Sequence, residues 1–290
     1  MKSLITTGLN GLVGSRFAKD FKDQYKFDNL DLRDKDQPTD ITNYEQVLER
    51  FKNSNATHVV HLAAYTDVTG AWNQTDDKGG LAYQVNVIGT ENVVKAAEET
   101  NKHVIYISTA YVFDGEKNDL YTEEDTPNPI EWYGKTKYLA EEVVKKANCK
   151  WTILRIDQPF RSDAFEKVDT AHRVMNGIKD GSLYPQFTNH YFGPTFVDDF
   201  SKILDFVIRT SPEGLFHASS GESWTDYDFA VAINQAHNLG GEIGAGDLDA
   251  YLASSERPYQ RNTAMSNKKL LEILDFKPKT IEEALKEVKS

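Results

Sequence analysis

Tyr133 and Lys137 are two side chains whose types and spacing are suited to proton transfer. They lie four residues apart at the start of a segment predicted to be helical, so both project from one helical face. A tyrosine phenol has a reference pKa of about 10, and an ammonium group one turn away would lower that pKa. We therefore predict that Tyr133 exchanges a proton with a carbonyl oxygen and that Lys137 tunes its pKa.

A third polar group, Thr109, ends a predicted strand and precedes Tyr133 by 24 residues. Ligands of open α/β sheets bind beyond the carboxyl ends of the strands, where a threonine hydroxyl can polarise the same carbonyl oxygen. Tyr-x-x-x-Lys by itself also occurs in helices as a packed tyrosine beside a surface lysine. The predicted catalytic residues are Thr109, Tyr133 and Lys137.

A G-x-x-G-x-x-G motif runs from Gly8 to Gly14, between a predicted strand and a predicted helix. Glycines permit the tight turn, and the backbone N–H groups at the helix N-terminus favour a bound pyrophosphate. The alternative is a glycine-containing turn without a ligand. We predict a dinucleotide site whose turn residues are Gly8, Asn10, Gly11, Leu12, Val13 and Gly14.

Charged residues near the second predicted strand bear on the choice of cofactor. Asp31 lies where an acidic side chain accepts the adenosine ribose hydroxyls, which favours NAD. Arg33, and Arg16 in the first helix, are either partners for a 2′-phosphate or ordinary surface charges. The predicted cofactor is NADPH or NADH.

Strands and helices alternate in the first half of the sequence and place these motifs at one sheet edge. The predicted strands are Ser3–Thr7, Lys26–Leu30, His58–Ala63, His103–Ser108 and Trp151–Ile156. The predicted helices are Leu12–Asp23, Asn43–Asn53, Gly80–Thr100 and Glu131–Ala147.

The predicted fold class is α/β, with a Rossmann doubly wound parallel sheet and a smaller C-terminal α/β substrate-binding lobe. The later segments supply Thr195–Thr210, Gly214–Ala218, Thr225–Leu239, a glycine-rich loop at Gly240–Gly246, and two terminal helices at Ser266–Asp275 and Thr280–Lys289. The predicted cofactor domain is residues 1–157 plus about 194–222, and the lobe is 158–193 plus about 223–290.

Composition excludes several classes of protein. The chain has 290 residues and a net charge of −12, which argues against binding nucleic acid or anionic membranes. The single cysteine, Cys149, excludes an intrachain disulfide and any multi-cysteine metal site, and no metal site is predicted. The first seven residues run directly into the glycine motif, so we expect no signal peptide and a cytoplasmic location.

Taken together, these motifs resemble the extended short-chain dehydrogenase/reductases, a Rossmann-fold group that acts largely on nucleotide sugars. Beyond the glycine turn, the similar segments are Asp40-Ile41, His61-Leu62-Ala63-Ala64 and Asn86-Val87-Ile88-Gly89-Thr90. The resemblance implies further cofactor contacts from Asp40, Ile41, Leu62, Ala63, Ala64 and Asn86.

Within that group the chain is most similar to the dTDP-4-dehydrorhamnose reductase family. Ser108–Gly115 resembles its S-T-D-Y-V-F-D-G, Tyr191–Thr195 its Y-G-x-P-T, and Arg257-Pro258 its R-P before the terminal helix. The resemblance implies NADPH- or NADH-dependent reduction of a 4-keto nucleotide sugar. Arg257 is either a clamp for the substrate diphosphate or a surface charge. The predicted substrate contacts are Thr109, Ala110, Tyr111, Tyr133 and Arg257.

Departures from the family pattern concern the substrate end. Ala110 replaces an expected aspartate, and Arg155–Arg161 reads R-I-D-Q-P-F-R where the family has R-T-S-W-V-Y-G. Arg16 stands where the family often uses an acidic residue at a metal-bridged dimer. We therefore carry over neither that dimer nor its metal, and a homodimer stays open.

Two other functions compete with the reductase. A nucleotide-sugar 4-epimerase would use the same three residues with bound NAD, and Ala110 is closer to the epimerase pattern. A non-catalytic dinucleotide-binding regulatory subunit would not need them. A 4,6-dehydratase is discounted, because Ala110 and Tyr111 supply neither the acid nor the base that such an enzyme has after its threonine.

Overall fold

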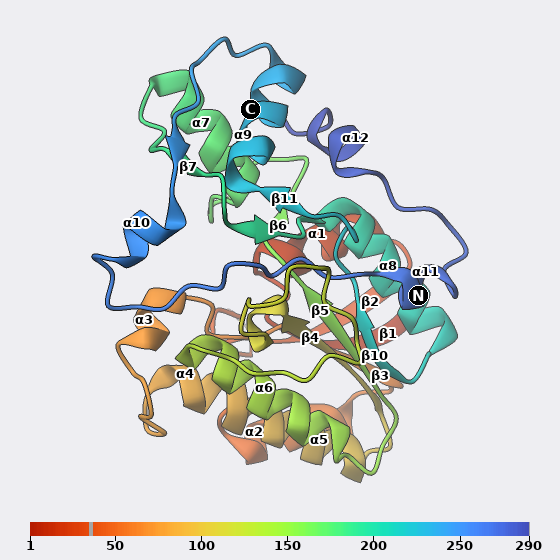
Figure 1. Ribbon diagram of the computed structural model, residues 1–290. Helices are drawn as coiled ribbons and strands as arrows, with labels where there is room; N and C mark the ends of the chain where they lie inside the picture. Colours follow the sequence, from red (N-terminus) through yellow and green to blue (C-terminus); the bar gives the residue numbers. More distant parts are fainter. Residues whose placement is uncertain (35–36, 290) are drawn as a thin grey trace.

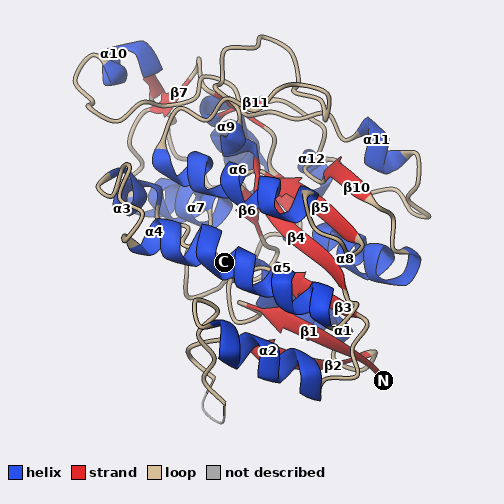
Figure 2. Ribbon diagram, turned by 90° about the horizontal axis from the view of Figure 1, so that it is seen from below, coloured by secondary structure: helices blue, strands red, loops and turns tan. Residues whose placement is uncertain are grey.

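A six-stranded parallel sheet forms the centre of the protein in the computed structural model, which describes residues 1–34 and 37–289. The strand order β10-β5-β4-β3-β1-β2 changes direction between β1 and β3, the kind of switch point beside which ligands bind (Figures 1 and 2). The strands are β1 (Lys2–Thr7), β2 (Tyr25–Leu30), β3 (His58–His61), β4 (His103–Thr109), β5 (Trp151–Ile156) and β10 (Gly214–His217). The α/β fold predicted from the sequence is confirmed.

Helices cover both faces of this sheet, because the strands are apolar on both sides. Neighbouring residues such as Leu4 and Ile5, or Ile153 and Leu154, point to opposite faces and belong to separate buried clusters. One cluster includes α1 (Leu12–Phe21) and α8 (Val197–Thr210), which pack together. The other includes α2 (Tyr44–Asn53), α5 (Gly89–Glu99) and α6 (Trp132–Lys145), which form the lower layer in Figure 1.

A smaller lobe lies beyond the carboxyl edge of the sheet, at the top of Figure 1. Its core packs Phe160, Phe192 and Phe229 between α7 (Thr170–Asp180) and α9 (Asp226–His237). The remaining elements are α3 (Val68–Trp72), α4 (Leu81–Tyr83), α10 (Leu248–Leu252), α11 (Lys268–Leu271), α12 (Ile281–Leu285), β6 (Pro159–Phe160), β7 (Gln186–Phe187), β8 (Tyr191–Phe192), β9 (Thr195–Phe196), β11 (Trp224–Thr225) and β12 (Ala245–Gly246).

The structure differs from the sequence prediction in several places, including the two terminal helices, which cover only Lys268–Leu271 and Ile281–Leu285. The single helix expected at Gly80–Thr100 is interrupted by a π-helical turn at Gln84–Ile88. The loop expected at Gly240–Gly246 contains β12, which pairs in parallel with β7. Helix α7 was not predicted, although Asp169 caps its start and Gly181, with φ of +72°, ends it.

Lys35 and Asp36 in the predicted cofactor domain, and Ser290 at the end of the predicted lobe, lie outside the described residues. Within the part of the chain that the structure describes, no helix is long and apolar enough to cross a membrane.

A buried ion pair joins three elements behind the sheet edge. Arg155 on β5 contacts Glu141 on α6 through two hydrogen bonds of 2.8 and 2.6 Å, and both side chains are at most 1% exposed. The Ser108 hydroxyl on β4 donates to the same carboxylate at 2.6 Å. This network fixes the spacing of the strands and the helix that carry Thr109, Tyr133 and Lys137.

Removing one member of this pair should destabilise the fold strongly, because the other charge would be buried alone. We expect Arg155→Met to lower the free energy of unfolding by about 3–5 kcal/mol. Lys150→Met is the matched control: Lys150 pairs with Glu213 on the surface at 3.0 Å and should cost less than about 1 kcal/mol. Urea denaturation measures both, and equal losses would contradict a special role for the buried pair.

Candidate active site

A cleft of about 800 Å³ lies at the carboxyl edge of the sheet and extends into the smaller lobe. Its walls come from the turn after β1, the ends of β3, β4 and β5, the start of α6, and the segment that follows β6. The predicted residues that line it are Gly8, Asn10, Gly11, Leu12, Val13, Gly14, Asp31, Arg33, Asp40, Ile41, Leu62, Ala63, Ala64, Thr109, Tyr111, Tyr133 and Lys137.

The glycine turn packs closely against neighbouring backbone. Gly8 has a φ of +66°, and a Cβ there would lie 2.7 Å from the backbone of Ala63. A Cβ at Gly14 would lie 2.6 Å from Leu9 backbone atoms. Helix α1 starts with Gly11 as its N-cap, has no side-chain cap and has no acidic residue in its first turn. Its free N–H groups therefore suit the pyrophosphate of a dinucleotide.

Asp31 and Arg33 occupy the end of the cleft where the adenosine ribose is expected. The Asp31 carboxylate accepts hydrogen bonds from Asn10 Nδ2 at 3.1 Å and from the Arg33 backbone N–H at 2.9 Å. The exposed Arg33 guanidinium lies 3.7 Å from Glu166. The carboxylate suits ribose hydroxyls and the guanidinium suits a 2′-phosphate, so the chemistry of this end fits NADH and NADPH alike.

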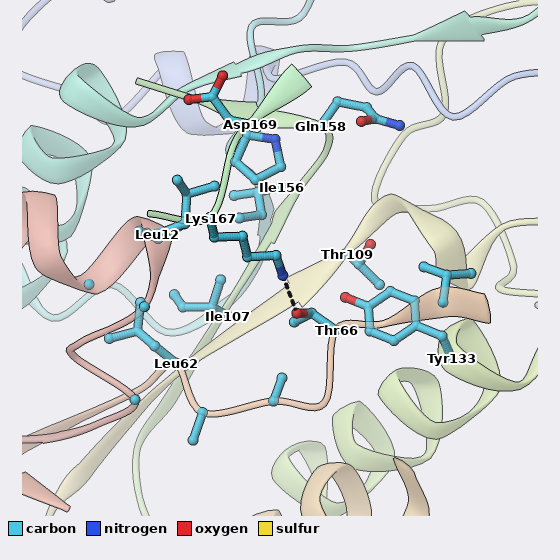
Figure 3. A pocket seen from close by; sticks show the side chains of 18 of the residues that line it. Leu12, Leu62, Thr66, Ile107, Thr109, Tyr133, Ile156, Gln158, Lys167 and Asp169 are labelled. Carbon is cyan, nitrogen blue, oxygen red and sulfur yellow. Dashed lines mark hydrogen bonds between the residues drawn. The ribbon is translucent and has the colours of Figure 1, made fainter. Parts of the chain in front are cut away.

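Thr109 and Tyr133 meet at the centre of the cleft. Thr109 ends β4, and Tyr133 lies in the first turn of α6, whose N-cap Glu131 accepts the Tyr133 and Gly134 N–H groups at 2.8 and 2.6 Å. Both side chains line the cleft, and Thr109 is near enough to the Tyr133 phenol to affect its pKa. Figure 3 shows the Tyr133 ring beside Thr109. Two hydroxyls at one point of a cleft can both reach the oxygen of a carbonyl ligand.

The pKa of Tyr133 does not change in the direction expected from the sequence. Burial raises it well above its usual range, although the neighbouring Thr109 side chain opposes this, and the charges of Glu131 and Asp157 raise it further. Lys137 does not lower it, because its ammonium donates instead to the Ile107 carbonyl at 2.8 Å and lies over the Tyr106 ring. The expectation that Lys137 lowers the pKa of Tyr133 is therefore wrong in this structure.

Lys137 is itself perturbed by its surroundings. Its side chain is buried, and burial lowers its pKa from 10.5 to about 7, although the Glu141 carboxylate opposes that shift. Of the groups at the centre of the cleft, Tyr133 keeps its proton while Lys137 gives its proton up easily.

Three predicted site residues do not line the cleft. Asn86 is buried behind it, where its side chain bonds the backbone of Tyr65 and the Thr136 hydroxyl at 2.9 Å. Ala110 is fully buried. Arg257 lies 4.5 Å above the ring of Tyr259, which does line the cleft.

Several lining residues were missed by the sequence analysis. Asp157 and Gln158 follow β5 directly, so the rule that sites form at the carboxyl ends of strands indicates them. The segment 165–169 crosses the cleft, and Lys167 donates to the Thr66 hydroxyl at 2.7 Å (Figure 3). His190, which bonds Asp226 at 2.7 Å, comes from the smaller lobe and has no local signal in the sequence.

Comparison with known proteins places this geometry in a family. The model of the RmlD substrate binding domain matches residues 1–290. A dTDP-4-dehydrorhamnose reductase of Aggregatibacter actinomycetemcomitans is 30% identical over 80% of this chain and 78% of its own. Methionine adenosyltransferase 2 subunit beta of Pongo abelii is 31% identical over 93% of this chain and 81% of its own.

A solved structure is similar along the whole chain. The dTDP-4-dehydrorhamnose reductase of Bacillus anthracis, in complex with NADP, superimposes with a TM-score of 0.88 and is 26% identical, and the match covers 99% of each chain. The similarity spans both the sheet and the smaller lobe.

The low pKa of Lys137 predicts a pH-dependent stability. Between about pH 7 and 10.5 the unfolded state binds a proton that the folded state has lost, so the stability of the fold rises with pH in this range. The destabilisation caused by this lysine is therefore largest below about pH 7 and disappears as the pH approaches 10.5. The stability of Lys137→Met relative to the wild type should therefore fall by a few kcal/mol between about pH 6.5 and 9.5.

Denaturation midpoints at both pH values measure this difference. Lys135→Met, which removes an exposed lysine two residues earlier on the same helix, is the matched control and should follow the wild type. A Lys137→Met difference that stays constant with pH would contradict the shifted pKa.

Proposed function

The chain belongs to the RmlD substrate binding domain family, and on this basis we propose that it is a reductase of the dTDP-4-dehydrorhamnose reductase type. It uses NADPH or NADH to reduce a 4-keto group on a nucleotide-linked deoxysugar. The observation that carries the proposal is that Thr109, Tyr133 and Lys137 line the same cleft as the glycine turn. The nucleotide sugar is the expected small-molecule partner. A cytoplasmic location and a homodimer remain expectations from the sequence.

The two sides of the cleft are assigned to different ligands. We assign the dinucleotide to residues 1–157 plus about 194–222, where the glycine turn, Asp31, Asp40 and Ala63 line the wall. We assign the nucleotide sugar to residues 158–193 plus about 223–290, which close the opposite side. The sugar carbonyl then lies between the parts, next to Tyr133.

Each catalytic side chain has a distinct task in the reduction. When bound, the dinucleotide supplies the hydride to the carbonyl carbon. Thr109 donates a hydrogen bond to the carbonyl oxygen, and the Tyr133 phenol gives that oxygen its proton as the carbon–oxygen double bond becomes a single bond. The raised pKa of Tyr133 keeps the phenol protonated before the reaction, as a proton donor requires. Lys137 lies one helical turn away, where its ammonium can position the nicotinamide ribose.

Tyr133→Phe should remove most of the activity without weakening cofactor binding. Loss of a general acid lowers kcat by about 10²–10⁴-fold, whereas the ring that packs in the cleft is retained. Tyr138→Phe, on the same helix but away from the cleft, is the control and should leave kcat within about twofold. The measurements are NADPH oxidation with dTDP-4-dehydrorhamnose and a fluorescence titration of NADPH, and a fully active Tyr133→Phe protein would refute the assigned role.

The stoichiometry of cofactor use separates the three candidate functions. A reductase oxidises one NADPH for each keto sugar reduced, so the absorbance of the reduced nicotinamide should fall in proportion to added substrate. A 4-epimerase interconverts sugars without net change in the amount of reduced cofactor. A binding subunit changes neither the sugar nor the cofactor. Absence of NADPH consumption across a panel of nucleotide-linked 4-keto sugars would reject the reductase.

A further inference from the structure

Asp157 is a buried acidic residue of the cleft for which the reduction described above has no task. It follows the last residue of β5, at the carboxyl edge of the sheet, and lines the cleft together with Tyr111 and Tyr133. Its exposure is only 2%. A carboxylate at such a depth normally has hydrogen-bond partners for both of its oxygens.

The two carboxylate oxygens of Asp157 have different surroundings. Oδ2 accepts hydrogen bonds from the Gly193 backbone N–H at 2.9 Å and from the Thr263 hydroxyl at 2.7 Å, so it holds together segments of the smaller lobe. Oδ1 is buried and has no hydrogen-bond partner among the described residues. A buried acceptor without a partner destabilises the protein, so Oδ1 is suited to a donor that arrives with a ligand.

The charge of Asp157 is felt at the reacting centre. It contributes to raising the pKa of Tyr133 and also that of Tyr111, although burial is the larger cause for both phenols. Asp157 and Tyr133 also line the same cleft. With the keto group at Tyr133, we therefore assign the group that reaches Oδ1 to the part of the substrate next to the carbonyl carbon.

The charge of Asp157 also selects among the parts of a nucleotide sugar. A diphosphate is anionic and is repelled by a buried carboxylate. The base lies at the far end of the substrate from the keto carbon. The sugar ring carries donors close to the carbonyl, and a neutral hydroxyl or a cationic amino group can each donate to a carboxylate.

We propose that Asp157 determines the sugar specificity of this protein, by accepting through Oδ1 a hydrogen bond from a hydroxyl or amino substituent on the ring carbon next to the keto group. This inference rests on the proposed function and names the ring substituent that the site recognises. Oδ2 keeps its hydrogen bonds to Gly193 and Thr263 and supports the fold, while Oδ1 recognises the substrate.

Asp157→Asn tests this division with little change in size. The amide oxygen can replace Oδ2 and keep the bonds from Gly193 and Thr263, while the NH₂ group turns the free acceptor into a donor. With dTDP-4-dehydrorhamnose we expect kcat/KM to fall by roughly ten- to a hundredfold, with the Kd for NADPH within about twofold of the wild type. The melting temperature should remain close to that of the wild type.

Thr263→Val is the matched control, because it removes a bond to Oδ2 and leaves Oδ1 unchanged. It should lower the melting temperature and keep kcat/KM within about threefold. A structural role for Asp157 alone predicts the opposite pattern, in which both variants lose stability and activity together.

Sugar analogues identify the substituent. The analogue that lacks the recognised hydroxyl should be reduced by the wild type as slowly as Asp157→Asn reduces the parent sugar, and it should show no further loss with the variant. An amino group in place of that hydroxyl should keep wild-type kcat/KM high if the recognised donor is cationic, and lower it if the donor is the hydroxyl. Equal kcat/KM for the wild type and Asp157→Asn with every sugar would overturn the inference.

A failure of the proposed function gives a different result. If the wild type oxidises no NADPH with any keto sugar, the reductase is rejected. The inference is then judged by calorimetric binding of dTDP-rhamnose, the alcohol product. If dTDP-rhamnose binds Asp157→Asn more weakly than the wild type, recognition by Oδ1 is supported. If its binding is unchanged, that recognition is refuted.

Discussion

The ion pair between Arg155 and Glu141 is the interaction on which the geometry of the cleft depends. Arg155 lies two residues before Asp157 on β5, and Glu141 lies one helical turn after Lys137 on α6. Ser108, which bonds the same carboxylate, directly precedes Thr109. Thr109, Lys137 and Asp157 thus each lie within one helical turn or two residues of a member of one buried network, and Tyr133 lies on the same helix as Glu141. Since a charge in this position is costly unless it is paired, the three elements keep a fixed separation.

Burial also sets the protonation states in the cleft. Burial disfavours the charged form of each group, so it raises the pKa of the Tyr133 phenol and lowers the pKa of the Lys137 ammonium. A neutral phenol is the form that can give a proton to a carbonyl oxygen, whereas the reverse oxidation requires a phenolate. The electrostatics of the site therefore keep Tyr133 protonated, and they arise from the packing of α6 against the sheet rather than from the Tyr133–Lys137 spacing alone.

Local patterns were sufficient to predict the sheet and the glycine turn that lines one end of the cleft. Strands that are apolar on both faces have a short sequence signature, and so does the glycine turn. For this reason β1, β4 and Gly8–Gly14 could be recognised without a structure. The substrate end could not be predicted, because His190 and Tyr259 reach the cleft through the fold of the smaller lobe. The pKa of Tyr133 was expected in the wrong direction because spacing reveals a neighbouring charge and does not reveal desolvation.

The cost of burying Lys137 bears on the alternative that the protein only binds a dinucleotide. A lysine with a pKa of about 7 destabilises the folded state at neutral pH, and a methionine of similar length would fill the same space without that cost. Binding of the pyrophosphate depends on the glycine turn and the start of α1, which do not involve Lys137. The retention of a destabilising lysine one turn from Tyr133 is explained by proton transfer at a carbonyl. A relative named as a subunit is 31% identical to this chain, so these side chains, and not overall similarity, distinguish an enzyme from a binding subunit.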